Sequence, residues 1–129
     1  MEYMMSEFFE AVVEADDAPI VICDREHRII YMNPTAVKRY EKWGGERLTG
    51  KSIFDCHNSR SREIILSVIA RFKAEPELNK VYTYTKNRDG EDRDVYMVAL
   101  RNKSGDLIGY YEKHESRVHE AQCGGNQKL

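Results

Sequence analysis

The sequence predicts one antiparallel α+β domain, in which helices cover one face of a sheet. Short β-branched runs stand near both ends of the chain, and the patterns typical of amphipathic helices are grouped between them. Strand runs separated by short polar turns pair antiparallel. Both ends therefore contribute to one sheet, and the helices must cover it, which leaves room for a cavity between the two layers. A chain of 129 residues is long enough for one hydrophobic core.

The first segment has the pattern of an amphipathic helix over residues 6–15, with Ser6 as its expected N-cap. Four adjacent side chains form its apolar stripe: Phe8, Phe9, Val12 and Val13. Such a stripe needs a cover, which is either the domain's own sheet or a second subunit. We predict a homodimer in which a second copy of the chain buries these four side chains.

The next elements follow from local patterns along the chain. Residues 18–24 and 28–32 are two short strands separated by a polar turn, which predicts a hairpin. The pair Asn33-Pro34 ends the second strand and starts a helix over residues 35–43. The strongest helical pattern covers residues 59–74, and Ser59 or Ser61 can cap it.

The last third of the sequence is rich in Val, Tyr and Thr, which is typical of strands. Turns containing glycine separate three such runs, at residues 80–87, 92–101 and 106–114. After Glu115 the periodicity is lost, and we expect a loose tail. The predicted organisation is an N-terminal helix at 1–15, the main domain at 16–115 and a C-terminal tail at 116–129.

Composition and charge exclude several classes of function. Twenty basic and 22 acidic residues leave a net charge of −2, which gives no reason to expect nucleic acid as a partner. No run of about 18 apolar residues is present to span a membrane, and the acidic N-terminus lacks the order of a signal peptide. Three cysteines without close spacing do not form a disulfide framework. We therefore expect a cytoplasmic protein that contacts neither nucleic acid nor membrane.

Three stretches, taken in order, carry a resemblance to a known family: "APIVICDREHRIIYMNPTAVKRY", "GERLTGKSIFD" and "RDGEDRDVYMVALRNKSGDLIGYYE". They are similar to the first hairpin, a middle segment and the closing hairpin of the PAS domain, a sensor module of bacterial signalling proteins. The resemblance covers roughly residues 8–115. It implies a PAS fold, with a five-stranded antiparallel sheet in the order 2-1-5-4-3 and helices on one face.

The same resemblance implies a sensory or protein-interaction module in signal transduction, without enzymatic activity. Its cavity between sheet and helices would bind a small ligand or a partner. The kinase, cyclase and DNA-binding outputs that often follow a PAS domain do not fit in the residues that remain. We therefore expect the protein to report by contact, with itself as a homodimer and with a downstream signalling protein.

We predict that seven residues contact a ligand in the cavity: Cys56, His57, Ile65, Ile69, Tyr96, Val98 and Tyr110. The side chains expected to fill the space between sheet and helices are Val21, Ile30, Ile53, Phe54, Ile65, Ile69, Val98 and Ile108. Tyr82 and Tyr84 are two residues apart in a strand, so we expect them on one face. Sheet packing with the hydroxyls at the rim is the favoured interpretation of the tyrosines, and a polar contact inside the cavity is the alternative.

The pair Cys56-His57 admits four interpretations, of which haem binding makes the most specific prediction. The stretch "DCHNSRSREIILSVI" resembles a PAS subgroup with a Cys-His-Pro-Pro-x-Ser segment, although Asn58 and Ser59 stand here in place of the prolines. A haem-binding gas or redox sensor would use His57 as the axial ligand. In the haem-binding relatives that histidine lies inside the long helix, at a position that corresponds to Ile64. A flavin is not expected, because no "N-C-R-F-L" segment occurs.

The other interpretations are a zinc site, a small enzyme and a structural role. Zinc would need four ligands, and the candidates are Cys23, Cys56, His57 and His114, with His27, His119 and Cys123 less suited. Antiparallel pairing places the end of the first strand and the end of the last strand apart, which disfavours zinc. Cys56 as a nucleophile is also disfavoured, because adjacent side chains diverge. We favour the structural interpretation, in which His57 hydrogen-bonds the turn and Cys56 packs as a small hydrophobic residue.

Overall fold

The computed structural model describes residues 5–118 of the chain. Its elements, in order, are α1 (Met5–Glu14), β1 (Val21–Asp24), β2 (Ile29–Met32), α2 (Pro34–Arg39), the 3₁₀ helices η1 (Glu41–Trp43), η2 (Gly45–Leu48) and η3 (Ile53–Cys56), α3 (Ser59–Ala74), β3 (Lys80–Arg88), β4 (Glu91–Arg101) and β5 (Leu107–Ser116). The order of helices and strands is the predicted one. The helix expected at residues 35–43 is divided at Tyr40 into α2 and η1.

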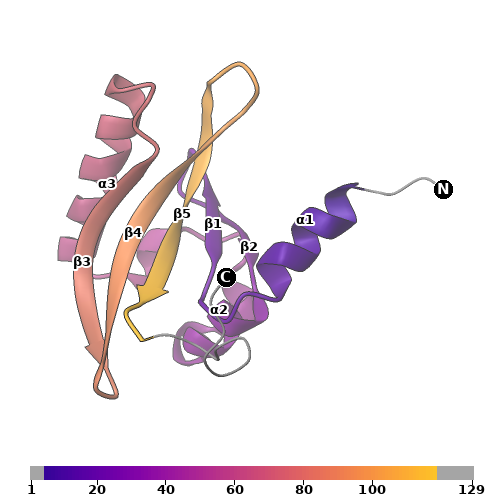
Figure 1. The fold of residues 1–129 in the computed structure, drawn as a ribbon, viewed down its shortest axis with the longest axis vertical. Coiled ribbons are helices and arrows are strands. Elements are labelled where there is room, and N and C mark those ends of the chain that lie inside the picture. Colours follow the sequence, from indigo (N-terminus) through magenta and orange to yellow (C-terminus); the bar gives the residue numbers. More distant parts are fainter. Residues whose placement is uncertain (1–4, 119–129) are drawn as a thin grey trace, which may run out of the picture.

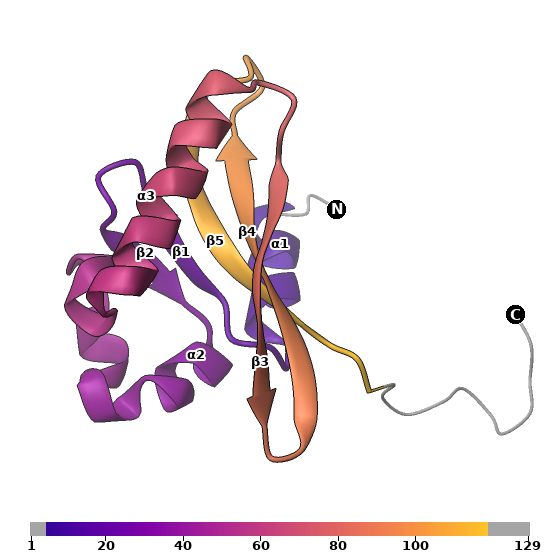
Figure 2. The same cartoon turned by 90° about the vertical axis from the view of Figure 1, so that its left-hand side faces the viewer.

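The five strands form one antiparallel sheet in the order β2-β1-β5-β4-β3, which confirms the predicted fold class. The two ends of the chain meet in the middle of this sheet, where Cys23 of β1 lies opposite Tyr110 of β5. Figures 1 and 2 show α2 and α3 on one side of the sheet and α1 on the other. We call the side of α2 and α3 the inner face of the sheet, and the side of α1 the outer face.

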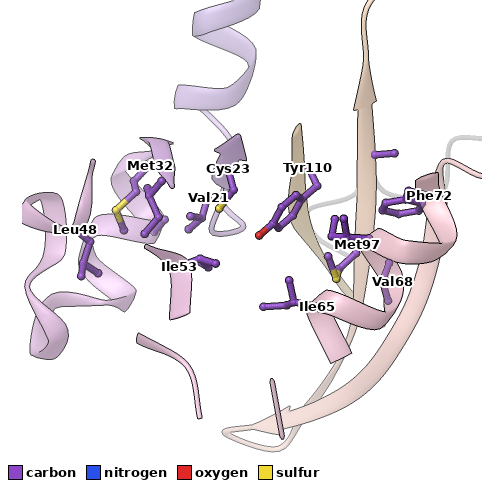
Figure 3. Packing of buried hydrophobic residues seen from close by; sticks show 14 residues of the cluster. Val21, Cys23, Met32, Leu48, Ile53, Ile65, Val68, Phe72, Met97 and Tyr110 are labelled. Carbon is purple, nitrogen blue, oxygen red and sulfur yellow. The ribbon is translucent and has the colours of Figure 1, made fainter. Parts of the chain in front are cut away.

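The hydrophobic core lies between the inner face and the helices. On β4 the residues Val95, Met97 and Ala99 are buried, and the residues between them are half-buried, as expected for a strand with one covered face. Figure 3 shows Met97 of the sheet beside Ile65, Val68 and Phe72 of α3. Burial of these apolar side chains holds α3 on the sheet.

Gly109 lies in the third of the three stretches that carry the family resemblance, and its position in the sheet requires a glycine. A Cβ atom at this position would overlap the backbone carbonyl of Cys23 on the neighbouring strand. Only glycine therefore allows β1 and β5 to approach each other at this point.

Asn33 joins α1 to the rest of the domain. Its side chain is fully buried, and its Oδ1 accepts hydrogen bonds from the backbone N–H groups of Ile20 and Ala36, both at 2.9 Å. The second of these bonds caps the N-terminus of α2. Its Nδ2 donates to three backbone carbonyls, those of Val13 (3.0 Å), Asp16 (3.3 Å) and Ala18 (3.0 Å). One side chain thus holds the end of α1, the start of β1 and the start of α2 together.

Two helix starts differ from the sequence prediction. Ser6 lies inside α1, which begins at Met5. The N-cap of α3 is Asn58, whose Oδ1 accepts the Ser61 backbone N–H at 2.9 Å. Asn58 has the extended backbone that an N-cap requires, so Ser59 is already the first helical residue.

Three residues expected to fill the cavity point away from it. Ile30 is 57% exposed and Ile108 is 51% exposed. Val98 lies on the outer face, because it alternates with the buried Met97 and Ala99. A strand pattern in which both faces carry apolar residues does not reveal which face is covered. β5 extends to Ser116, one residue past the predicted end of the main domain. Residues 119–129, most of the predicted tail, lie outside the described part of the chain. The division into helix, main domain and tail at residues 15 and 115 stays a prediction.

Candidate functional site in the inner layer

A row of polar side chains occupies the inner face of β5. Tyr110, Glu112 and His114 are alternate residues of this strand, opposite Ala99, Met97 and Val95 of β4. The three partners on β4 are buried apolar residues, so the β5 residues face the same helical layer. We call Tyr110, Glu112 and His114 the β5 polar row. Polar groups at such positions are uncommon in a core and need partners.

Glu112 is the charged centre of this row. Its side chain is 17% exposed, and His114 Nε2 lies 3.8 Å from Oε2. Burial by itself would raise the pKa of the Glu112 carboxyl. The opposite effect of three side chains, His114, His57 and Lys86, is larger and holds this pKa below the ordinary 4.5. Glu112 is therefore an ionised carboxylate at neutral pH inside the domain.

A β-bulge brings Tyr84 to the same place. Tyr82 pairs with Tyr96 and Tyr84 pairs with Val95, so the register shifts between Tyr82 and Tyr84. The shift puts Tyr82, which is 53% exposed, on the outer face with Tyr96, and Tyr84 on the inner face. The expectation that Tyr82 and Tyr84 share one face is wrong for this reason. Burial and the negative charge of Glu112 raise the pKa of Tyr84 to about 12.

Cys56 and His57 form the end of η3, next to this site. His57 Nδ1 lies 2.9 Å from the backbone carbonyl of Ile53, and the Cys56 thiol donates to the same carbonyl at 3.2 Å. The His57 bond requires a hydrogen on Nδ1, because the carbonyl oxygen can only accept. Burial and Glu112 raise the pKa of the Cys56 thiol to about 11, so it is a thiol at neutral pH. These contacts are the ones that the structural interpretation of the pair predicts.

Tyr40 completes this part of the inner layer. Its ring centroid lies 6.5 Å from that of His57, and burial together with the charge of Glu112 raises its pKa. Arg39, the preceding residue, supplies positive charge beside Tyr40 and Tyr84. Two tyrosines, a histidine and a carboxylate thus surround one region of the layer between sheet and helices.

A second polar cluster lies at the other end of the row. The Tyr110 hydroxyl and His27 Nδ1 are 2.8 Å apart, and the His27 ring packs on Phe54 with centroids 4.9 Å apart. Burial raises the pKa of the Cys23 thiol to about 12, although its hydrogen bond with Tyr110 acts in the opposite direction. In Figure 3 the Tyr110 hydroxyl points into the space between Ile53 and Ile65. This end of the layer is closed by its own hydrogen bonds.

The open space of the site lies in front of Glu112. It is a gap of about 10 Å³ between the first turns of α3 and the strands β3 to β5. Its lining residues are Ser61, Ile64, Ile65, Thr83, Tyr84, Met97 and Glu112. A volume of this size holds about one water molecule.

The structure brings most of the predicted ligand-binding residues together. Cys56, Ile65, Ile69 and Tyr110 belong to or pack against the core cluster, and His57 lies beside Cys56 and Tyr40. Tyr96 and Val98 do not join them, because they lie on the outer face, where the Lys80 ammonium stands 4.2 Å from the Tyr96 ring. Their placement in the cavity is a wrong prediction, because the helices cover the face of β4 that carries Val95, Met97 and Ala99.

The sequence did not predict Tyr40 or Glu112 as site residues, and it suggested His27 only as a weak zinc candidate and Tyr84 only as the less favoured alternative for the tyrosines. Alternation from Tyr110 along β5 places Glu112 on the same face, so the sequence carried a signal for it. Tyr84 depends on the bulge, which no local pattern reveals. Within residues 5–118 no three Cys, His, Asp or Glu side chains gather as ligands for a metal ion, and Cys23 and His114 are apart along β1 and β5.

Comparison with known proteins agrees with this architecture. The family model described as the PAS fold matches residues 13–113. The chain belongs to the PAS-fold family. Members of this family are sensory and interaction modules in signal transduction. Among the described residues no helix is long and apolar enough to cross a membrane.

Solved structures with the same fold have low sequence identity to this PAS domain. A PAS domain from Colwellia psychrerythraea is 15% identical with a TM-score of 0.65, covering 88% of this chain and 97% of that one. The PAS domain of Bordetella pertussis BvgS is 20% identical with a TM-score of 0.60, covering 89% and 88%. The Aer2 receptor of Vibrio cholerae, a dual PAS-haem oxygen sensor, is 18% identical with a TM-score of 0.52, covering 78% and 94%. No curated protein sequence matches this chain significantly.

Proposed function

We propose that this PAS domain is a sensor that binds a small ligand in the layer between the sheet and the helices, and transmits the binding event through α1. One observation carries the proposal. The inner layer contains an ionised carboxylate, Glu112, together with the hydroxyls of Tyr40 and Tyr84 and the imidazole of His57. A core built for stability alone would carry apolar side chains there, because buried polar groups are costly.

The route to α1 supports the second half of the proposal. His114 of the β5 polar row is 3% exposed and lines a groove of about 240 Å³ between α1 and the outer face. Val13 of α1 and Asp16 line the same groove, and the carbonyls of both accept hydrogen bonds from Asn33. A change at Glu112 therefore has a short path, through His114, to the end of α1.

The test of ligand binding uses amide chemical shifts of the full-length chain. Adding the low-molecular-mass fraction of a bacterial extract should shift the amides of Ser61, Tyr84 and Glu112 and leave exposed Lys103 in the turn before β5 unchanged. Uniform or absent shifts would contradict a ligand site in this layer.

We further propose that α1 mediates a homodimer or contact with a downstream signalling protein. Phe9 and Val12 are 65% and 70% exposed, and Phe8 is 50% exposed, so the stripe that the sequence predicts is open on one side. Sedimentation velocity of Phe9→Glu should give a lighter species than the unchanged chain, with Glu10→Gln on the same helix as the control. A point substitution is preferable to deleting α1, because deletion removes the Val13 carbonyl from Asn33.

A haem sensor with His57 as axial ligand is not supported by the residues present. The gap in the inner layer measures about 10 Å³, far below the volume of a porphyrin, and an ionised carboxylate faces it. An enzyme using Cys56 is also unsupported, since its thiol is protonated at neutral pH. The unpaired thiols of Cys23 and Cys56 fit the reducing cytoplasm that we propose as the location.

A further inference from the structure

The gap in front of Glu112 has a defined chemistry. Four of its seven lining side chains carry oxygen atoms: Ser61, Thr83, Tyr84 and Glu112. The Thr83 hydroxyl donates to the Val95 carbonyl at 2.8 Å, so its lone pairs remain as acceptors. The Glu112 carboxylate accepts and cannot donate. Acceptors therefore outnumber donors around this gap.

Within residues 5–118, no donor makes a close hydrogen bond to the Glu112 carboxylate. In the described part of the chain, His114 is the one basic side chain within 4 Å of the carboxylate, and its Nε2 is 3.8 Å away, too far for a good hydrogen bond. Lys86 acts on Glu112 from a longer range, and Arg39 acts on Tyr40 and Tyr84. A buried carboxylate with spare acceptor positions gains free energy from a cationic donor placed in the gap.

Size and ligand number decide which cation fits. The gap has the volume of about one water molecule, which matches an –NH₃⁺ group and is too small for a guanidinium or a trimethylammonium head. A primary ammonium offers three donors to the surrounding oxygen atoms. Calcium needs six to eight oxygen ligands and magnesium a near-octahedral set, which one carboxylate among hydroxyls does not supply.

We propose that this gap binds the primary ammonium group of a small organic amine, held by the Glu112 carboxylate and the hydroxyls of Thr83 and Tyr84. The rest of the amine would lie between the first turns of α3 and β3, which line the gap through Ser61, Ile64 and Thr83. This inference rests on the proposed ligand-binding function and names the class of ligand.

A matched series of four-carbon compounds tests the proposal on the full-length chain. The probes are n-butylamine, 1-butanol, butyrate and butyltrimethylammonium, added at fixed pH 7 and fixed ionic strength while amide shifts of Ser61, Thr83, Tyr84 and Glu112 are followed. We expect n-butylamine to bind at least about tenfold more tightly than each of the other three, a difference of about 1.4 kcal/mol in binding free energy.

Two variants locate the preference. Glu112→Gln should remove the advantage of n-butylamine over 1-butanol. Glu115→Gln removes the same charge from the outer face of the same strand, where Glu115 pairs with Lys80 and Lys113, and should leave the advantage intact. If Glu112→Gln fails to fold, Tyr84→Phe replaces it and should reduce the advantage at least about threefold, because it removes one hydrogen bond from a charged donor.

The outcomes separate this inference from the proposed function. Equal or tighter binding of 1-butanol or butyrate at the same amides would overturn the amine class and leave the ligand-binding layer standing. Equal binding of butyltrimethylammonium would overturn the size argument, and with it the primary ammonium. If no probe shifts these amides at any concentration, the gap is a water site, and both the amine class and a ligand site at Glu112 are refuted.

Discussion

Replacing Asn33 by alanine should be among the most destabilising single changes in this domain. Asn33 is fully buried and makes five hydrogen bonds, two through Oδ1 and three through Nδ2. Losing the α2 cap costs about 1 kcal/mol. Leaving the buried Ile20 N–H without a partner costs about 1–3 kcal/mol more. With the three carbonyls also unpaired, we expect about 3–5 kcal/mol, against about 5–15 kcal/mol for a typical domain.

Asn33→Asp separates the two halves of this effect. Aspartate keeps the oxygen that caps α2 but loses the amino group that binds the carbonyls of Val13, Asp16 and Ala18. It also places a negative charge against those carbonyls. We expect the core to stay folded while the amides of α1 exchange with solvent faster than in the unchanged chain.

Urea unfolding and amide hydrogen exchange measure the two variants. Asn87→Ala serves as the control, because Asn87 is exposed and bonds only Asp92 on the neighbouring strand, so its loss should cost less than about 0.5 kcal/mol. A cost below about 1 kcal/mol for Asn33→Ala would refute the role of Asn33 as the joint. So would Asn33→Asp with unchanged exchange in α1.

Three further predictions concern other parts of the structure. Arg101 donates hydrogen bonds to the backbone carbonyls of Phe72 (2.8 Å), Glu75 (3.3 Å) and Leu78 (3.0 Å), at and just after the end of α3. Arg101→Ala should therefore lower the free energy of unfolding, measured in urea, by about 2–3 kcal/mol. A loss under about 0.5 kcal/mol would contradict this. Folding lowers the pKa of Glu112 from 4.5, so its ionised form stabilises the fold above that pH, and this contribution is lost as the pH falls. Glu112→Gln should therefore weaken the fall in unfolding free energy below pH 4.5. An unchanged fall would count against an ionised Glu112. Burial raises the pKa of Cys56 from 9.0 to about 11 and that of Cys23 to about 12. In a Cys123→Ser variant, iodoacetamide should therefore label both thiols at least about a hundredfold more slowly in the native chain than in urea. Similar rates in the two conditions would show that the thiols are reactive.

The sequence by itself determined the elements of this domain. Period-two patterns and glycine turns define β3, β4 and β5, and the spacing of apolar residues defines α3. These signals are local, because strand and helix periods are set by backbone geometry within a few residues. Their order along the chain was enough to indicate the sheet and the family. Alternation along β5 also places Tyr110 and Glu112 on one face.

Only the tertiary structure decided which side chains meet. A single bulge at Thr83 turns Tyr84 inward and leaves Tyr82 outside, and a shift of one residue reverses every face beyond it. Val98 and Ile108 are apolar on the face that the helices do not cover, so their composition resembles that of core residues. The charge on Glu112 depends on His57 and His114, groups that arrive from another element and from its own strand. Register, covered face and electrostatic neighbours are set by contacts between segments far apart in the chain, and no local pattern encodes them.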